Sequence, residues 1–180
     1  ELPPLASEYR RLPGVDVGAE SPALRLALRQ MLNRRSVALD LLDDLGETAS
    51  SFELAAHLQE GAPTVGRRLR ERLAVTIDVQ LAWANGWQAW RVWRAAAEAA
   101  GVLVFQFTKV SLEEARGLSL LEWPLPVVGI NGKEAVPEAK AFTLLHELVH
   151  LMLARGQEER PALLETRSAD EWSQVERFAE

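Results

Sequence analysis

One segment, residues 142–153, constrains this chain more than any other feature. It reads Phe-Thr-Leu-Leu-His-Glu-Leu-Val-His-Leu-Met-Leu, which places His146 and His150 four residues apart with Glu147 between them. Residues four apart lie one turn apart on the same face of a helix, so both imidazoles can point at one metal ion. Apolar residues surround the motif at helical spacing, which predicts a buried helix. Because burying these polar groups without partners is costly, the pattern favours a metal site over a solvated helix.

The H-E-x-x-H spacing is typical of zinc hydrolases, and each residue type has a chemical reason to be there. The two histidines supply neutral nitrogen ligands, and zinc lowers the pKa of a bound water from about 15.7 to roughly 7. A carboxylate within hydrogen-bond reach can take a proton from that water and later hand it to a leaving amine. We therefore assign Glu147 the role of general base. His57, the other histidine, has no ligand spacing near it and is interpreted as an ordinary helix-face residue.

Length and composition limit the class of protein. A chain of 180 residues can bury one good core, or a core and a smaller lobe. The absence of cysteine excludes thiolate zinc sites and disulfides, so a metal must be held by histidine and carboxylate. No apolar run approaches the roughly 20 residues needed to cross a bilayer, and the start lacks signal-peptide features. We expect a soluble cytoplasmic protein with no membrane partner.

The charge pattern bears on nucleic-acid binding. A net charge of −6 argues against direct binding of nucleic acid by the chain as a whole. There is one local basic cluster, which we interpret as a solvated helix face: Arg67, Arg68, Arg70 and Arg72.

Hydrophobic periodicity and turn signals predict an α+β fold, mostly helical, with a small three-stranded sheet packed on the metal helix. Residues 1–20 are expected to form an extended arm, residues 21–77 an N-terminal helical lobe, and residues 78–180 the metal-binding domain. Helices are predicted at 21–45, 51–60, 63–73 and 77–100, after Pro137 and from Ser168, and strands at 102–107, 117–121 and 126–130. The chain does not begin with Met and ends within a predicted helix, so we expect the C-terminus to be truncated.

Four tryptophans form a stripe in the predicted helix 77–100. They are Trp83, Trp87, Trp90 and Trp93, spaced by 4, 3 and 3 residues on one broad face. Large aromatic side chains mostly serve core packing, which is our interpretation of the stripe. An aromatic peptide-binding surface is the alternative.

Two histidines need a third protein ligand and an open position for water. A second helix packed across the first would bring an acidic residue to the metal. Spacing along the chain does not choose among the candidates after His150, which are Glu158, Glu159, Glu165, Asp170, Glu171, Glu176 and Glu180.

Four motifs follow one another before and within the metal helix. They are Gly-Val-Leu-Val at 101–104, Glu-Ala-Arg-Gly-Leu-Ser-Leu at 114–120, Pro-Val-Val-Gly-Ile-Asn at 126–131 and the segment 142–151 described above. With these motifs in this order, the chain resembles the ImmA/IrrE metallopeptidases over roughly residues 90–180. The resemblance implies a zincin-like core and a single zinc ion, Zn²⁺, with Mn²⁺ or Fe²⁺ as alternatives in the cell.

The resemblance also implies a third ligand. Family members carry a glutamate in a pattern like E-x-x-(C/A)-N, roughly two dozen residues after the second histidine. The segment 176–180, Glu-Arg-Phe-Ala-Glu, fits this pattern with a glutamate in place of Asn, so the resemblance assigns the third ligand to Glu176. Glu171 is the runner-up, because shifting the pattern by five residues gives a poorer match.

The function implied by the resemblance is that of a zinc-dependent endopeptidase with one protein substrate. That substrate would be a helix-turn-helix transcriptional repressor, in stress-response, mobile-element or toxin-antitoxin control. Strand addition at the sheet edge would hold the peptide, and we expect the lip of the cleft to consist of Val127, Val128, Gly129, Ile130 and Asn131. Two alternatives remain: a regulatory binding module that does not cleave, and zinc hydrolysis of a non-peptide substrate.

Overall fold

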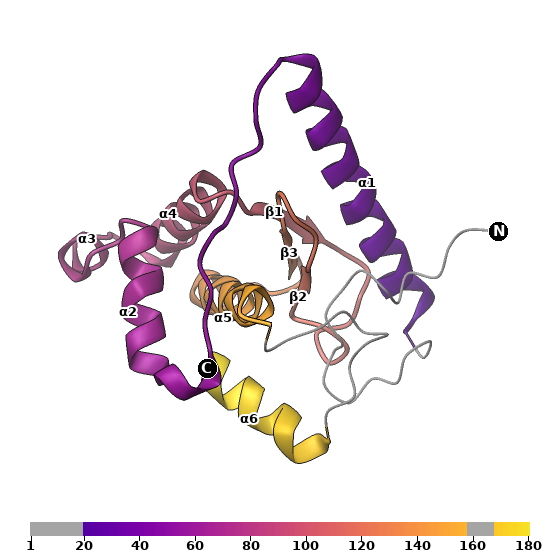
Figure 1. Ribbon diagram of the computed structural model, residues 1–180. Helices are drawn as coiled ribbons and strands as arrows, with labels where there is room; N and C mark the ends of the chain where they lie inside the picture. Colours follow the sequence, from indigo (N-terminus) through magenta and orange to yellow (C-terminus); the bar gives the residue numbers. More distant parts are fainter. Residues whose placement is uncertain (1–19, 158–167) are drawn as a thin grey trace.

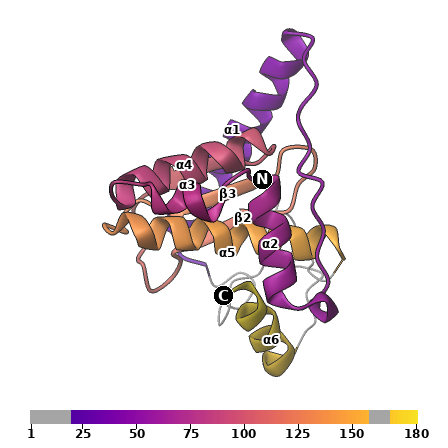
Figure 2. The same cartoon turned by 90° about the vertical axis from the view of Figure 1, so that its left-hand side faces the viewer.

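The computed structural model describes residues 20–157 and 168–180 (Figure 1). The elements in chain order are α1 Pro22–Asp44, η2 Leu58–Glu60, α2 Ala62–Arg72, α3 Ile77–Leu81, α4 Gly86–Ala99, β1 Leu103–Phe107, β2 Gly117–Leu120, β3 Val127–Asn131, α5 Pro137–Arg155 and α6 Ala169–Ala179. The fold is α+β and mostly helical, with one small mixed sheet, as the sequence predicts. The sheet lies between α1 on one face and α4 and α5 on the other, and Figure 2 shows these helices from the side.

β3 is the central strand of the sheet. It pairs with β1 in parallel, with Leu103 opposite Val127, and with β2 in antiparallel, with Leu118 opposite Gly129. Side chains alternate between the two faces, so Val127 packs toward α1 whereas Val128 packs toward α4 and α5. Every residue of β3 is buried, as expected for a strand covered on both faces and paired on both sides.

α1 is fixed at its beginning to the segment that leads into β2. Ser21 caps the helix, and the Glu114 carboxylate accepts hydrogen bonds from both the backbone N–H and the hydroxyl of Ser21, each 2.9 Å long. One turn of α1 lies very close to the central strand, because a Cβ on Gly129 would come within 2.6 Å of the Met31 sulfur. The second half of α1 extends beyond the sheet, where Leu41 is exposed (Figure 1).

The helix predicted at residues 51–60 is wrong. Most of this segment is extended, and only its end forms η2. Phe52 and Ala56 are fully buried, and the backbone N–H of Ala56 donates to the carbonyl of Met152 near the end of α5, at 2.9 Å. The segment therefore packs along the core without forming a helix, although Leu54, Ala55 and Leu58 lie at helical spacing.

The single helix predicted for residues 77–100 is two helices, α3 and α4. The break follows from a cap that the tryptophan pattern obscured: the Asn85 side chain accepts a hydrogen bond from the N–H of Gln88 at 3.0 Å. Gly86 follows at the first helical position, where an added Cβ would collide with the Glu138 carboxylate of α5. The cap and this close approach set where α4 begins.

The tryptophans mostly pack in the core. Trp90 and Trp93 are buried in α4, and Trp83, which precedes α4, lies edge-on against Trp93 with ring centroids 5.7 Å apart. The core interpretation is confirmed for these three rings. Trp87 is different, because it is 49% exposed and the Lys140 ammonium lies 5.6 Å from its ring centroid.

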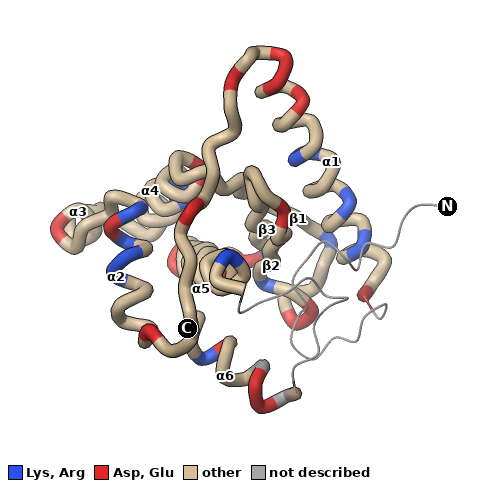
Figure 3. Tube along the Cα trace, in the orientation of Figure 1, with Lys and Arg blue, Asp and Glu red and all other residues tan. Residues whose placement is uncertain are grey.

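The basic cluster lies on α2 (Figure 3), and only part of it forms a solvated face. Arg68 donates hydrogen bonds to the Glu60 carboxylate at 2.6 Å, which ties α2 to η2. Arg70 lies 5.3 Å from the ring centroid of Trp93. Arg67 is exposed. Two of the arginines thus stabilise the packing of α2, and the solvated interpretation holds for Arg67 and Arg72, which are both exposed.

The helices before residue 77 share their cores with the rest of the chain. Val65 and Leu69 of α2 belong to the same buried cluster as Leu144 and Leu148 of α5, and α1 completes a second cluster with the sheet. The boundary predicted at residue 77 therefore does not separate two hydrophobic cores. The predicted arm lies outside the described residues except for its last position.

Candidate metal centre

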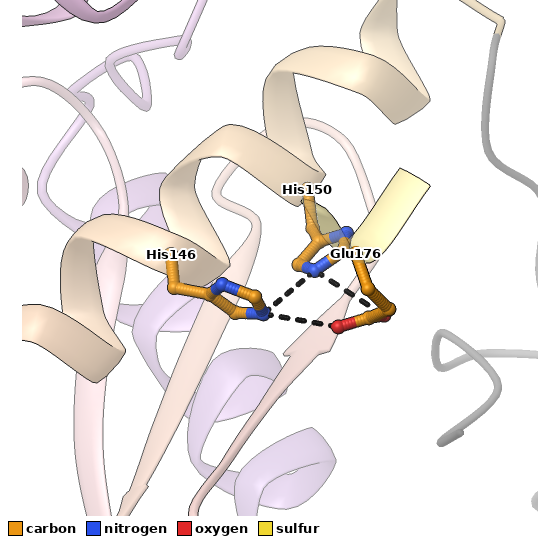
Figure 4. Close-up of side chains that lie close together, drawn as sticks. All are labelled: His146, His150 and Glu176. Carbon is orange, nitrogen blue, oxygen red and sulfur yellow. Dashed lines mark hydrogen bonds and ion pairs between the residues drawn. The ribbon is translucent and has the colours of Figure 1, made fainter. Parts of the chain in front are cut away.

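α5 carries the H-E-x-x-H motif and buries most of it. The helix packs on the sheet and on α4 through fully buried residues such as Leu144 and Leu148, which fixes its rotation. His150 and Glu147 are buried, whereas the His146 side chain keeps 16% of its surface exposed and forms part of a cleft wall. The two imidazoles consequently point to the same side of α5 (Figure 4).

Three side chains converge at this point (Figure 4). The Nε2 atoms of His146 and His150 lie 2.9 Å apart. Glu176 completes the group, with Oε2 at 3.3 Å from His146 Nε2 and Oε1 at 3.6 Å from His150 Nε2. All three ligand atoms lie within 4.8 Å of one another, so the group could bind a metal ion.

The distances between these ligand atoms test whether one ion fits. A tetrahedral ion with bonds of about 2.1 Å holds its ligand atoms about 3.4 Å apart. The observed separations of 2.9, 3.3 and 3.6 Å lie on both sides of that value. The chemistry of the group, two imidazole nitrogens and one carboxylate, is also a donor set that divalent metal ions accept in proteins.

The His146 ring is oriented by its neighbours on α5. Phe142 stacks on it with ring centroids 6.2 Å apart, and the ring of His150 meets it edge-on at 4.5 Å. Its Nδ1 is buried and has no hydrogen-bond partner among the residues that the structure describes. Ring packing therefore directs the Nε2 of His146 toward the other two ligands.

Glu176 reaches the histidines from a separate helix, α6. Ser168 begins this helix with a capping box, in which its hydroxyl accepts from the N–H of Glu171 and the Glu171 carboxylate accepts from the N–H of Ser168 at 2.8 Å. Val175 and Ala179 are buried and anchor the helix. The structure thus brings Glu176 to the histidines, while Glu171, the runner-up, serves as a cap in the first turn.

The remaining acidic candidates do not join the ligand group. Asp170 lies exposed in the first turn of α6, and Glu180 lines the cleft beside Glu176 without belonging to the three ligands. Glu158, Glu159 and Glu165 lie outside the described residues.

Glu147 is held against the sheet. The hydroxyl of Ser119 in β2 donates a hydrogen bond to its carboxylate, and both side chains are buried. β2 comes close to α5 at Gly117, where an added Cβ would collide with Thr143 and lie 3.0 Å from the Oε1 of Glu147. The carboxylate therefore has a defined direction on the floor of the cleft.

The ligand group opens onto a cleft of about 520 Å³. α5 forms one wall with Phe142 and His146, and the segment leading into β2 forms the other with residues 112–116. Arg116 stands on that second wall, 61% exposed, with its guanidinium 2.7 Å from the Glu134 carboxylate. His146, Glu147 and Glu176 therefore line a cleft that is open to solvent.

The substrate lip predicted at Val127, Val128, Gly129, Ile130 and Asn131 is wrong. These residues form β3, which is buried and paired on both sides, so its backbone cannot receive an added strand. Asn131 has a structural task instead, because its side-chain amide donates to the carbonyls of Val110 and Ala115 at 3.2 and 2.8 Å. β2 is the strand beside the cleft, and within the described residues its outer edge has no strand partner.

Sequence reasoning missed Ser119 as a functional residue. The signal was present in the motif at residues 114–120, in which Gly117 and Ser119 occupy alternate positions of a strand. Alternation puts both residues on the same face of β2. That face meets α5 at Glu147. The contact joins a strand and a helix that are far apart in the sequence, so neither local pattern predicts it.

The described part of the chain thus holds one group of three residues, two histidines and a glutamate, that could bind a metal ion. Its helices are too short or too polar to span a membrane.

Comparison with known proteins finds no family model, no curated protein and no solved structure that matches this chain.

Proposed function

We propose that this protein is a zinc-dependent endopeptidase. The observation that carries the proposal is the convergence of His146, His150 and Glu176 beside an open cleft, with Glu147 on its floor. A metal group of purely structural purpose would not need an open cleft or a buried carboxylate next to it. The resemblance to the ImmA/IrrE metallopeptidases adds support, because Glu176 is the ligand that it implies.

The two histidines and Glu176 would hold the ion. When bound, Zn²⁺ supplies Lewis-acid polarisation of a peptide carbonyl, stabilises its developing negative charge and makes a water more acidic. Glu147 accepts the proton of the attacking water as general base and then delivers it to the leaving amine as general acid. Ser119 keeps the Glu147 carboxylate in position through their hydrogen bond.

β2 replaces β3 as the strand that would hold a peptide. The outer edge of β2 borders the cleft at Gly117, close to Glu147. An extended peptide added there would form backbone hydrogen bonds with β2, and its scissile bond would pass the ligand group. The peptide would thus bind by strand addition, but at the edge of β2 and not at β3.

The substrate that we propose is a transcriptional repressor of the helix-turn-helix type, cleaved at one site in the cytoplasm. This part of the proposal follows from the family resemblance. Regulation of a stress response, of a mobile element or of a toxin-antitoxin pair would be the outcome. Contact with DNA would belong to the repressor, since the net charge of −6 does not favour nucleic acid.

The proposal is tested with zinc-loaded protein and an unfolded model protein such as casein, followed by candidate repressors. Wild-type protein is expected to cleave, and Glu147→Gln is expected to retain zinc and fold while its rate falls roughly 100- to 10,000-fold. Retention of full activity by Glu147→Gln would sink the mechanism.

A non-cleaving binding module is the second candidate. Glu180 favours it, because it adds a negative charge to the cleft at the position where the family pattern has Asn. Under this alternative the zinc-loaded protein binds a partner and cleaves neither casein nor that partner. Glu147→Gln would then leave partner binding unchanged.

A further inference from the structure

A second groove, of about 570 Å³, lies on the other side of His146. It runs between α2, α5 and α6, and it shares Phe142, His146 and Glu180 with the metal cleft. The two hollows therefore adjoin each other at His146. Figure 2 shows α2 crossing beside α5, with α6 next to both.

The walls of this groove are apolar. Val65 and Leu69 come from α2, Leu145 and Val149 from α5, and Phe178 from α6. Binding of an apolar side chain against such walls is favourable because apolar surface leaves water. A polar side chain would lose its hydration there, which is unfavourable.

A glycine lines the groove on the α2 side. Gly66 lines it in the middle of the helix, and a Cβ added there would meet no atom within 4 Å. Its φ angle is not in the left-handed region, so neither packing nor backbone geometry requires glycine at this position. Glycine weakens a helix relative to alanine, and a larger side chain introduced at this position would begin in open space at the groove wall.

The rim of the groove is basic on its α2 side, opposite Glu180 of the C-terminal end. Arg67 and Arg70 both line it from α2. Arg70 is held in place by hydrogen bonds to the carbonyl of Val75 at 3.1 Å and to the Gln80 side chain at 2.8 Å, whereas Arg67 is exposed. A substrate carboxylate near the rim would therefore face Arg67.

We propose that this groove is a specificity site: it receives a large apolar side chain next to the scissile bond, and Arg67 receives an acidic side chain beyond it. The inference rests on the proposed peptidase function and adds a substrate class to it. A peptide in the metal cleft must continue past His146, and the groove is the space that its neighbouring side chain then meets.

The test measures binding and does not depend on turnover. The probes are two peptidyl hydroxamates that differ only in the side chain next to the zinc-binding group, isobutyl in one and methyl in the other. Their affinities for zinc-loaded protein are measured by calorimetry. Isobutyl is expected to bind roughly 10- to 50-fold tighter than methyl, because its additional carbons leave water.

Substitutions on α2 test whether the groove causes the preference for isobutyl over methyl. Gly66→Phe should fill the groove and bring the affinity ratio of the two probes close to one, with the methyl probe unaffected. Thr64→Phe is the matched control, since Thr64 is exposed on the same helix and does not line the groove, and it should keep the wild-type ratio. Gly66→Ala controls for the gain in helix propensity and should also keep most of the ratio.

Failure of the groove assignment can be distinguished from failure of the proposed peptidase function. Equal affinities in wild type, or a ratio that Gly66→Phe leaves unchanged, would overturn the groove assignment even if casein is cleaved. Failure of both probes to bind zinc-loaded protein would overturn the metal site and the groove assignment together.

The role of Arg67 has its own probe, an isobutyl hydroxamate extended by aspartate and compared with one extended by asparagine. Aspartate should improve affinity by about 2- to 5-fold at low salt, and Arg67→Glu should reverse the order. Equal affinities of the two extended probes in wild type would overturn this part of the proposal.

Discussion

The hydroxyl of Ser119 in β2 donates a hydrogen bond to the carboxylate of Glu147 in α5. The bond crosses from the sheet to the metal helix, and both side chains are buried there. A carboxylate with a rotatable side chain is thereby held in one direction. In the proposed mechanism the sheet would thus orient the general base, in addition to packing against α5.

Ser119→Ala should lower kcat while leaving metal content unchanged. Loss of one hydrogen bond to a charged group is worth about 1.5–3 kcal/mol, which corresponds to roughly a 10- to 100-fold lower rate. The variant is assayed for casein cleavage and, by elemental analysis, for zinc. A variant with reduced zinc would show that the hydroxyl supports the ligands and not the base, contrary to the assignment.

Glu176→Ala should lose zinc, and Glu171→Ala should retain it. Both residues lie on α6, but only Glu176 joins the histidines, whereas Glu171 caps the first turn. We expect wild type and Glu171→Ala to keep about one zinc per chain after dialysis, as measured by elemental analysis. Glu171→Ala should instead lose about 1 kcal/mol of stability through the cap. Zinc loss in Glu171→Ala alone would mean that the register of α6 is wrong.

The stability of the link between η2 and α2 should depend on pH. The hydrogen bond from Arg68, assisted by the backbone N–H of His57, lowers the pKa of the Glu60 carboxyl from 4.5 to about 2. A pKa that is lower in the folded protein means that the ionised carboxylate stabilises the fold above about pH 4.5, and this contribution disappears as the pH falls through 2.

Glu60→Gln should remove this dependence. Its melting temperature, followed by circular dichroism, should lie below that of wild type at pH 7, and the difference should shrink between pH 4.5 and pH 2. Glu71→Gln, an exposed position on α2, serves as the control. A difference that stays constant over this range would contradict the assigned ion pair.

Gly129→Ala should destabilise the protein, because its Cβ would come within 2.6 Å of the Met31 sulfur. Overpacking of this kind typically costs about 1–3 kcal/mol. Gly66→Ala is the matched comparison, since its Cβ meets open space, and it should stabilise by about 0.5–1 kcal/mol. Denaturant unfolding of both variants checks the pair, and equal effects would mean that α1 does not pack closely on β3.

The elements that local patterns describe were predictable from sequence. The metal helix follows from apolar residues at helical spacing around His146 and His150, and α1 and α6 follow from the caps Ser21 and Ser168. The third ligand depended on family spacing, because chain distance alone leaves seven acidic candidates open.

The wrong predictions concern elements whose structure depends on segments distant in the sequence. Whether β3 is a central or an edge strand depends on pairing with both β1 and β2, which no local pattern of Val127 reports. Leu54 and Leu58 suited a helix by spacing, yet a backbone hydrogen bond from Ala56 to α5 holds the segment in a non-helical conformation. Tertiary contacts overrode local preference in both cases.

The ligand group takes two residues from α5 and one from α6, so an ion bound there would join two helices that are otherwise held by a few buried side chains of α6. Ion binding and the docking of α6 would then be reciprocal: each would strengthen the other by the same factor. Chelation would release α6 before the rest of the fold, and a partner that displaced α6 would weaken zinc binding to an equal degree. Activity would thus be set by the position of one short helix, with no regulator needing to enter the cleft.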